Sequence, residues 1–412
     1  MHSENSHALF NNSNWRHSEM PVVRDKEGRP IFCLATVLAL LENHEDWRSV
    51  LKYNEFSGKC EIHKIIPGSK VSEPSLPREF EDKDVTHAVI WFNRNGFPNA
   101  TKAIVTDALF AWASSQIINP PREFLQSLRW DGIERLPSWL QTFVGAEESD
   151  YVTEVGLRFF VSLVARVLRP GCKSDECMVL EGGQGVGKSS LLRAIVGDEY
   201  FGDALPDIRT KDASIYIRGR WVVELSELSV LRRADFESVK SFISRQEELY
   251  RAPYARNAKS EPRMNVFAGT TNRSDYLGDP TGSRRFLPIT VSRIDLPGIC
   301  LAREQLFAEA VAAFNSGDQW WVKKELLENA ALVQSERGED DPWIAKVIEH
   351  CEGLEAVSCT SILTKTIKMD ITQAGNRETK RIANILIAEG WQRDGKFTFG
   401  VDKGRARYVR LK

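Results

Sequence analysis

One segment of the sequence has the residue types and spacing of a phosphate-binding loop. The apolar stretch 177–180 leads into Gly182-Gly183-Gln184-Gly185-Val186-Gly187-Lys188-Ser189, and a helical pattern begins at Ser190. This order satisfies the pattern G-x-x-x-x-G-K-[ST], in which glycines let backbone N–H groups face phosphate oxygens. The lysine neutralises the β- and γ-phosphates, and the serine hydroxyl can bind Mg²⁺. We therefore predict ATP and Mg²⁺ as cofactors; the alternative is a glycine-rich turn with a chance lysine. The predicted ATP contacts are Gly182, Gly183, Gln184, Gly185, Val186, Gly187, Lys188, Ser189 and Ser190.

A phosphate-binding loop needs a carboxylate at the end of a neighbouring strand, and the sequence supplies two. Residues 221–223 are apolar, and Glu224 and Glu227 follow them. In such a site one carboxylate holds Mg²⁺ and the other polarises the attacking water. We predict that Ser189 and Glu224 bind the metal and that Glu224 and Glu227 are catalytic, with the choice of base left open. Alternatively, Glu227 caps the helix that begins near Arg233.

Two further polar signals accompany apolar strands later in the chain. Asn272 directly follows the strand-like stretch 265–271, where an amide can orient the attacking water; the alternative is an ordinary turn residue. Arg284 and Arg285 stand in a Pro/Gly-containing loop just before another apolar stretch. Arginine binds phosphate oxygens through two parallel hydrogen bonds and stays charged, so this pair can supply a finger to a neighbouring subunit's nucleotide. The alternative is a surface pair engaged in salt bridges.

The elements that must position these residues change in character near residue 176. Before it, helical periodicity marks residues 36–41, 103–113, 120–128 and 150–168. After it, short apolar runs at 177–180, 221–225, 266–268 and 286–291 alternate with helical stretches. That alternation is typical of an α/β domain with a largely parallel sheet. The fold class predicted for the core is therefore α/β.

The length of 412 residues is two to four times that of a usual domain, which predicts several domains. The charged break at 335–342 is the best linker candidate. The predicted division is a disordered lead-in at 1–20, a mostly helical, collar-like region at 21–150, a phosphate-loop ATPase domain at 151–334, the linker at 335–342 and a C-terminal domain at 343–412.

The C-terminal block reads as three helices followed by a hairpin. Helical patterns cover 343–350, 358–368 and 377–389, and the residues around Asp402-Lys403-Gly404 are typical of a hairpin turn. Three helices and a hairpin predict a winged helix. From residue 391 to the end, seven basic side chains stand against two acidic ones, which favours contact with duplex DNA. A winged helix used only for packing or protein contacts is the alternative. The DNA-contact candidates here are Arg377, Lys380, Arg381, Lys403, Arg405 and Arg407.

A second basic stretch lies between the acidic strand and Asn272. In residues 245–259 cations interleave with tyrosines, and such a segment can contact phosphates and stack on bases of a single strand. An ordinary solvated loop is the alternative. The candidates in this stretch are Arg251, Tyr254, Arg256 and Lys259.

The composition excludes some classes of protein but does not show whether the chain binds nucleic acid. A net charge of −2 excludes a blanket polycation of the histone kind, but it leaves room for local basic surfaces. The longest apolar run, 31–41, is too short to cross a bilayer, and the N-terminal residues do not resemble a signal peptide. Seven scattered cysteines without metal-type pairing predict reduced thiols. We expect a cytoplasmic protein that does not bind membranes.

Several stretches together resemble the virulence-associated E family of phage- and island-encoded proteins, which is related to superfamily 3 helicases of the AAA+ class. The resemblance covers roughly residues 95 to 325. The stretches that carry it are Leu128-Arg129-Trp130-Asp131-Gly132, Val179-Leu180-Glu181-Gly182, Trp221-Val222-Val223-Glu224-Leu225-Ser226-Glu227-Leu228, Gly269-Thr270-Thr271-Asn272-Arg273, Asp279-Pro280-Thr281-Gly282-Ser283-Arg284-Arg285-Phe286, Ala308-Glu309-Ala310-Val311 and Trp320-Trp321.

The resemblance implies a ring-forming NTPase, a homo-hexamer that moves along DNA during replication of a mobile element. It matches Lys188 and Ser189 to the Walker A pair, Glu224 and Glu227 to the acidic motif, and Asn272 to the sensor. It also favours Arg285 as the arginine finger, with Arg284 second, and a pore hairpin for single-stranded DNA within 245–259.

The sequence departs from relatives of this kind in two places. Leu225 and Ser226 separate two acids that are adjacent in many superfamily 3 members, so the base stays unassigned. No paired-carboxylate motif precedes the ATPase region, and we expect no primase activity. The predicted function is a DNA-dependent ATPase acting as a ring-shaped replicative helicase of a phage or mobile element. The alternatives are a helicase loader or replication initiator that does not unwind DNA, and a phage-interference NTPase.

Overall fold

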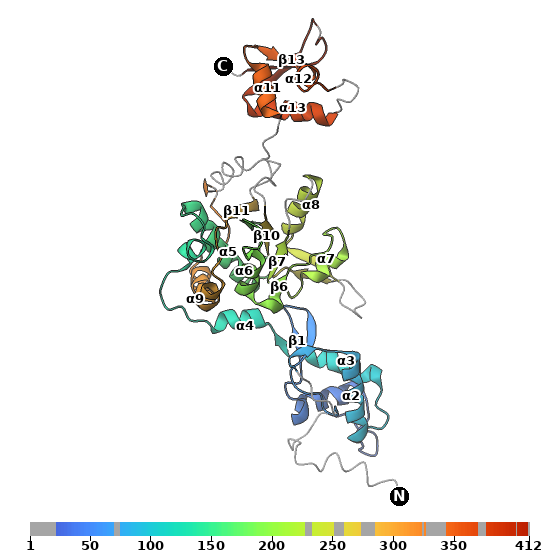
Figure 1. Cartoon of the computed structure of the whole chain (residues 1–412). Helices are drawn as coiled ribbons and strands as arrows, with labels where there is room; N and C mark the ends of the chain where they lie inside the picture. The colour runs from blue at the N-terminus through green and yellow to red at the C-terminus, as the bar shows by residue number, and fades with distance from the viewer. Residues whose placement is uncertain are drawn as a thin grey trace. The chain divides into compact units, whose positions relative to one another are not determined.

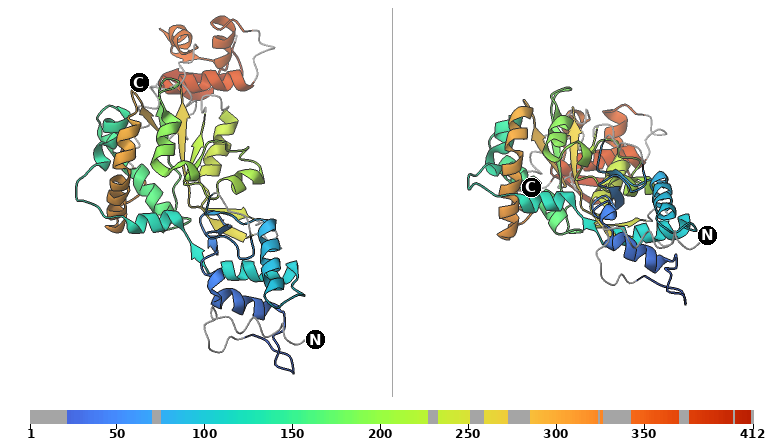
Figure 2. Two further views of the ribbon diagram at one scale, coloured as in Figure 1. Left: turned by 60° about the horizontal axis from the view of Figure 1, so that its bottom comes forward. Right: turned by 90° about the horizontal axis from the view of Figure 1, so that it is seen from below.

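The computed structural model describes residues 22–69, 75–226, 233–250, 259–272, 285–323, 325–326, 343–369, 376–400 and 402–410. By its internal contacts the chain divides into two compact units, Met1–Glu336 and Arg337–Lys412. Each unit is considered by itself (Figures 1 and 2). In the described part of the chain no helix is long and apolar enough to cross a membrane.

The first part of unit 1 combines helices with a small sheet. The helices are α1 (Leu34–Asn43), α2 (Asp82–Arg94) and α3 (Lys102–Ala113), with a short 3₁₀ turn, η2, at Glu45–Trp47. The sheet has the order β3-β2-β1-β4, formed by β1 (Leu51–Asn54), β2 (Lys59–Ile62), β3 (Arg78–Glu79) and β4 (Ile117–Ile118). A mostly helical region was predicted, and the sheet is an addition. Strands of two to four residues are too short to reveal their alternation in the sequence.

A five-stranded parallel sheet forms the centre of unit 1, as the alternating apolar runs predicted. Its order is β11-β5-β10-β7-β6, and every neighbouring pair is parallel. The carboxyl ends of β5, β10 and β7 are therefore next to one another at one edge of the sheet. The strands are β5 (Cys177–Glu181), β6 (Phe201–Gly202), β7 (Val222–Leu225), β10 (Val266–Thr271) and β11 (Phe286–Thr290).

Helices cover both faces of this sheet, because alternate strand residues enter two different apolar clusters. Met178 and Leu180 pack with α5, α6 and α9, whereas Cys177 and Val179 pack with α7 and α8 (Figure 1). Six apolar residues between 125 and 146 also belong to the first cluster, so packing against the sheet begins before the predicted boundary at 150. They are Leu125, Leu136, Trp139, Leu140, Val144 and Ala146. The elements are α4 (Pro120–Ser127), η3 (Leu136–Ser138), η4 (Leu140–Val144), α5 (Asp150–Leu168), α6 (Lys188–Val196), η5 (Asp198–Tyr200), α7 (Lys211–Tyr216), α8 (Arg233–Ile243) and α9 (Leu296–Asn315).

The stretch with predicted single-strand contacts contains a two-stranded antiparallel ladder. β8 (Glu247–Tyr250) pairs with β9 (Lys259–Pro262), and Tyr250 stands opposite Lys259. The connecting residues 251–258 lie outside the described residues.

Unit 2 contains the predicted three helices and hairpin. They are α11 (Ile344–Cys351), α12 (Cys359–Lys365), α13 (Asn376–Ala388), β13 (Trp391–Lys396) and β14 (Ala406–Arg410). A short strand, β12 (Ala356–Val357), completes a sheet of order β12-β14-β13. Ile382, Ile385 and Leu386 of α13 belong to the buried cluster of this unit.

Candidate functional site

The glycine-rich loop, residues 182–189, connects the end of β5 to the start of α6. At Gly182 a Cβ atom would lie 2.7 Å from the carbonyl oxygen of Val291, so a side chain does not fit there. Gly187 precedes α6 with φ of 101°, a left-handed conformation that glycine adopts without strain. These two glycines let the chain turn sharply and bring the first backbone N–H groups of α6 to the carboxyl edge of the sheet.

Lys188 links the glycine-rich loop to the end of β10. Its Nζ donates hydrogen bonds to the carbonyl oxygens of Gly182 at 2.7 Å and Gly183 at 2.9 Å. The same ammonium donates to Oδ1 of Asn272 at 2.9 Å. Lys188 is only 7 % exposed, whereas Asn272 is exposed. The ammonium is thus held at the point where the loop and the residue after β10 meet.

Glu224 places a buried carboxylate beside the first turn of α6. Its Oε1 accepts hydrogen bonds from Ser189 Oγ at 2.7 Å and from Thr270 Oγ1 at 2.5 Å. Within the described residues its Oε2 accepts none, although the side chain is only 3 % exposed. The structure therefore brings Lys188, Ser189, Glu224 and Asn272 to one edge of the sheet. Glu227 lies outside the described residues.

Thr270 is a site residue that sequence reasoning did not single out. In the sheet Ala268 of β10 stands opposite Glu224 of β7, so Thr270, two residues further along, is a diagonal neighbour on the same face. The only signal in the sequence was its place in the stretch Gly269-Thr270-Thr271-Asn272.

Arg285 lies at the amino-terminal ends of the strands, opposite the end of the sheet where the glycine-rich loop lies. It directly precedes β11, whose Phe286 pairs with Cys177 at the start of β5, whereas the glycine-rich loop follows the end of β5. Its Nε contacts Oδ2 of Asp175 at 3.1 Å. Arg285 is therefore not joined to the other predicted catalytic residues within one chain. Arg284 lies outside the described residues.

The comparisons with known proteins cover this same region. The family model of the virulence-associated protein E-like domain matches residues 125–339, which are 215 of the 412 residues. The chain belongs to this family. No curated protein matches the chain.

Two solved structures of the NrS-1 C-terminal region share a low level of identity with this family member. One, an apo structure of residues 305–718, is 13 % identical, covers 70 % of this chain and 78 % of its own, and has a TM-score of 0.42. The other, an A-form apo structure, is 12 % identical, covers 88 % of this chain and 96 % of its own, and has a TM-score of 0.46.

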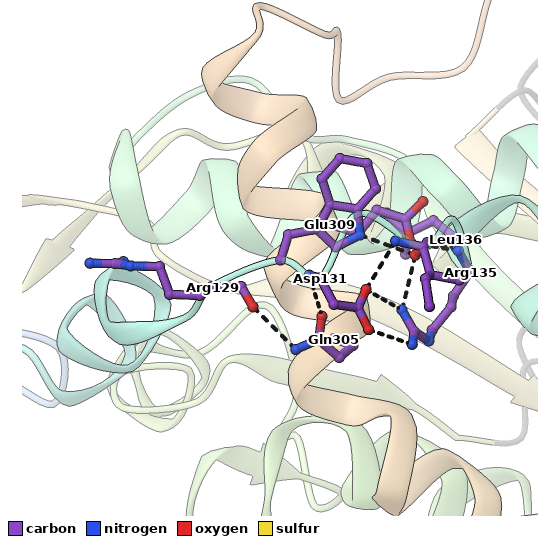
Figure 3. Close-up of polar contacts among 8 residues, drawn as sticks. Arg129, Asp131, Arg135, Leu136, Gln305 and Glu309 are labelled. Atoms are coloured by element: carbon purple, nitrogen blue, oxygen red, sulfur yellow. Dashed lines mark hydrogen bonds and ion pairs between the residues drawn. The ribbon is translucent and has the colours of Figure 1, made fainter.

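Hydrogen bonds hold residues 129–136 against α9 (Figure 3). This stretch lies within the match to the virulence-associated protein E-like domain. Asp131 binds the guanidinium of Arg135 through both carboxylate oxygens, at 2.8 and 2.7 Å. The Arg135 side chain lowers the pKa of Asp131 to about 2. Gln305 of α9 accepts from the Asp131 N–H at 3.0 Å and donates to the Arg129 carbonyl at 3.1 Å. These contacts fix the chain that enters the sheet domain.

The single-strand candidates are only partly described. Arg251, Tyr254 and Arg256 lie outside the described residues; Lys259 begins β9, and its side-chain placement is not described. The base of the ladder is anchored by Arg263, whose Nε donates to Glu248 at 2.8 Å. Both side chains are buried. Glu248 also accepts from Ser214 Oγ of α7, and Arg263 Nη1 donates to the Phe242 carbonyl of α8, so the base of the ladder is fixed to the helices of the sheet domain.

The duplex candidates of unit 2 lie on α13 and the hairpin. The Arg381 guanidinium stands 4.2 Å from the ring centre of Trp343. Arg405 contacts Asp402 and Arg407 contacts Asp394, each at 3.0 Å, and Lys403 is exposed. Arg377 and Lys380 are residues of α13 whose side chains are not described. Two of the six candidates are thus paired with acids inside this unit.

Proposed function

We propose that the chain is a DNA-dependent ATP hydrolase, a ring-shaped replicative helicase of a phage or mobile genetic element. In this proposal the sheet domain is a P-loop NTPase core of the AAA+ and superfamily 3 type, and unit 2 is a winged helix. One observation carries the proposal. Lys188, Ser189, Glu224 and Asn272 come from three neighbouring parallel strands and their following segments, and hydrogen bonds join them at one edge.

The edge supplies the groups that nucleotide phosphates need. The N-terminus of α6 offers backbone N–H groups for an anion. The Lys188 ammonium can exchange its carbonyl and amide acceptors for β- and γ-phosphate oxygens. The proposed ATP-binding residues are therefore 182–190.

The oxygen donors beside Lys188 fit Mg²⁺. Ser189 Oγ and the Glu224 carboxylate are hard ligands, and Oε2 of Glu224 has no partner among the described residues. When bound with ATP, the ion would neutralise charge that develops on the phosphate oxygens.

Hydrolysis then requires a positioned water. Attack of its oxygen on the γ-phosphorus breaks the bond to the bridging oxygen, which leaves with ADP, and a carboxylate takes the proton from the water. Glu224 or Glu227 is the base in this proposal. Asn272 stands beside Lys188 and is exposed, where its amide can orient the water.

Arg285 completes the site of a different copy of the chain. Arg285 stands level with residue 176, and the glycine-rich loop begins six residues further along at Gly182, a span of roughly 20 Å at ~3.3 Å per residue. Because that span exceeds the reach of an arginine side chain, Arg285 acts in trans. A closed ring, a homo-hexamer in this proposal, gives every nucleotide such a neighbour.

DNA stimulation and strand displacement test the function and separate it from its alternatives. ATP turnover is measured with and without single-stranded DNA, and a labelled forked duplex reports unwinding. The helicase predicts both stimulated turnover and displaced strand. Stimulated turnover without displacement would favour a loader or initiator, and absence of turnover under all conditions would refute the proposal.

A further inference from the structure

Four consecutive residues just before β5, the 173–176 loop, are hydrogen-bonded to three other segments: α5, the residue before β11 and the segment that follows α9. The loop precedes β5 and lies next to Arg285. Two backbone carbonyls of the loop accept hydrogen bonds: Lys173 from Trp320 Nε1 at 2.7 Å and Ser174 from Arg166 Nη2 at 3.0 Å. Two carboxylates of the loop also accept: Asp175 Oδ2 from Arg285 Nε at 3.1 Å and Glu176 from the Val322 N–H at 2.9 Å.

These contacts make the 173–176 loop a fixed support. Arg166 is fully buried in α5, and Trp320 and Val322 follow α9. The loop is therefore bonded to α5 and to the segment that follows α9. A carboxylate carried by such a loop has a defined position, which a side chain on a free surface loop does not have.

Asp175 uses this support to hold one end of the Arg285 guanidinium. The contact engages Nε, whereas Nη1 and Nη2 have no hydrogen-bond partner in the part of the chain that the structure describes. The side chain is 24 % exposed and borders a cavity of about 760 Å³ that Arg158, Lys173 and Trp321 also line. The guanidinium is thus restrained at one nitrogen and keeps the two nitrogens that can bind a phosphate side by side.

We propose that Asp175 is the positioning residue for Arg285 and that the cavity beside them receives the nucleotide edge of a second copy of the chain. This inference rests on the proposed function, since it concerns the nucleotide that the second copy holds. An arginine side chain has four rotatable bonds, and fixing it before the copies meet lowers the ordering cost at the moment of catalysis.

The first test compares Asp175→Asn with Asp207→Asn in the full-length protein. Asp207 contacts the Nε of Arg209 at the same 3.1 Å, but both side chains are more than half exposed, so it is a matched control. We expect Asp175→Asn to lower kcat by about tenfold or more while the Kd for a fluorescent ATP analogue stays unchanged. Asp207→Asn should match the wild type in both. Should Asp175→Asn lose nucleotide binding, Asp175→Ser is measured instead, with the same expectation.

The second test asks whether Asp175 acts across copies. Mixing Lys188→Ala with Arg285→Ala subunits should restore turnover, because the first supplies the arginine and the second the phosphate-binding loop. A Lys188→Ala/Asp175→Asn double variant should restore less than one fifth of that activity, since its Arg285 is misplaced. Equal restoration by both, or an unchanged kcat of Asp175→Asn beside an inactive Arg285→Ala, would overturn the inference. Absence of hydrolysis by the wild type would instead refute the proposed function.

Discussion

Lys188 and Asn272 are joined by a hydrogen bond of 2.9 Å between the ammonium and the amide oxygen, although 84 positions separate them in the chain. The bond connects the residue that begins α6 with the residue that follows β10. Both lie at the carboxyl edge of the parallel sheet, where ligands bind in open α/β folds. The hydrogen bond thereby holds the Lys188 ammonium and the Asn272 amide next to each other at the carboxyl ends of the strands.

Replacing Thr270 by valine should weaken the use of Mg²⁺. The change keeps the shape of a β-branched side chain and removes the hydroxyl that donates to Glu224 Oε1. We expect kcat to fall by about tenfold and the Mg²⁺ concentration for half-maximal turnover to rise, because the carboxylate loses one of its two orienting bonds. Steady-state ATPase assays over a Mg²⁺ titration measure both. Thr210→Val at the exposed start of α7 is the control, and equal Mg²⁺ curves for the two variants would contradict this role.

Glu176 should make the protein less stable as the pH rises. Burial raises the pKa of Glu176 to about 7, with smaller effects from Asp175 and Glu154, while the Val322 N–H and Lys173 act in the opposite direction. The folded state therefore holds the proton more tightly than the unfolded chain, whose carboxyl has a pKa of 4.5. The stabilisation is complete below pH 4.5 and is lost as the pH rises through about 7.

A Glu176→Gln variant should lack this loss, since its amide oxygen can still accept from the Val322 N–H and carries no charge. A pKa of about 7 against 4.5 corresponds to about 3 kcal/mol. Urea unfolding at pH 5 and pH 8 should show the variant gaining up to about that amount on the wild type at the higher pH. Parallel pH curves for the two proteins would rule the effect out.

Glu309 should be needed for stability rather than chemistry. Its Oε2 accepts from the backbone N–H groups of Arg135 at 2.7 Å and Leu136 at 2.9 Å, and the side chain is buried. Glu309→Ala leaves both N–H groups without this acceptor, at a cost of about 2–4 kcal/mol. Glu309→Gln keeps an acceptor and should cost less. Chemical unfolding gives these values; the exposed Glu304→Ala on the same helix is the control, and equal losses for Glu304→Ala and Glu309→Ala would contradict the assignment.

Glu248 should anchor the base of the β8–β9 ladder. Glu248→Gln removes the charge that faces the buried guanidinium of Arg263, which we expect to cost about 3 kcal/mol of unfolding free energy. The neighbouring Glu247→Gln, which changes an exposed side chain, should cost little. Denaturant unfolding of the two variants and the wild type measures both costs. Equal free energies of unfolding for Glu248→Gln and Glu247→Gln would show that the buried pair does not stabilise the ladder.

Four of the five strands of the central sheet, β5, β7, β10 and β11, were predictable because each is a largely apolar run ending near a glycine or a polar residue. β5 and β11, for example, agree with the predicted runs to within one residue at each end. The short strands β6 and β4 have two residues each, which is a single period of alternation and too short to show a pattern. β8 and β9 contain Glu, Lys and Ser, so their pairing depends on tertiary contacts and not on apolar pattern.

The site was predictable where a residue ends an element and not where it acts through a lateral neighbour. Lys188 follows the glycine-rich loop after β5 and Asn272 directly follows β10, and the sequence alone indicates both positions. Thr270 and Asp175 were not predicted, because each acts by a hydrogen bond to a residue far away in the sequence. Thr270 contacts Glu224 across 46 positions, and Asp175 contacts Arg285 across 110 positions. Strand order and register decide such contacts, and neither is contained in local sequence.

The rate of ATP hydrolysis by a Lys188→Ala variant decides whether the glycine-rich loop is a site of ATP turnover. Lys102→Ala, at the exposed start of α3, is the matched control. We expect turnover of Lys188→Ala with DNA present to fall by roughly a hundredfold or more, while sedimentation shows the same assembly as the wild type. Turnover of Lys188→Ala at the wild-type rate would show that the protein is not an ATPase that uses this loop.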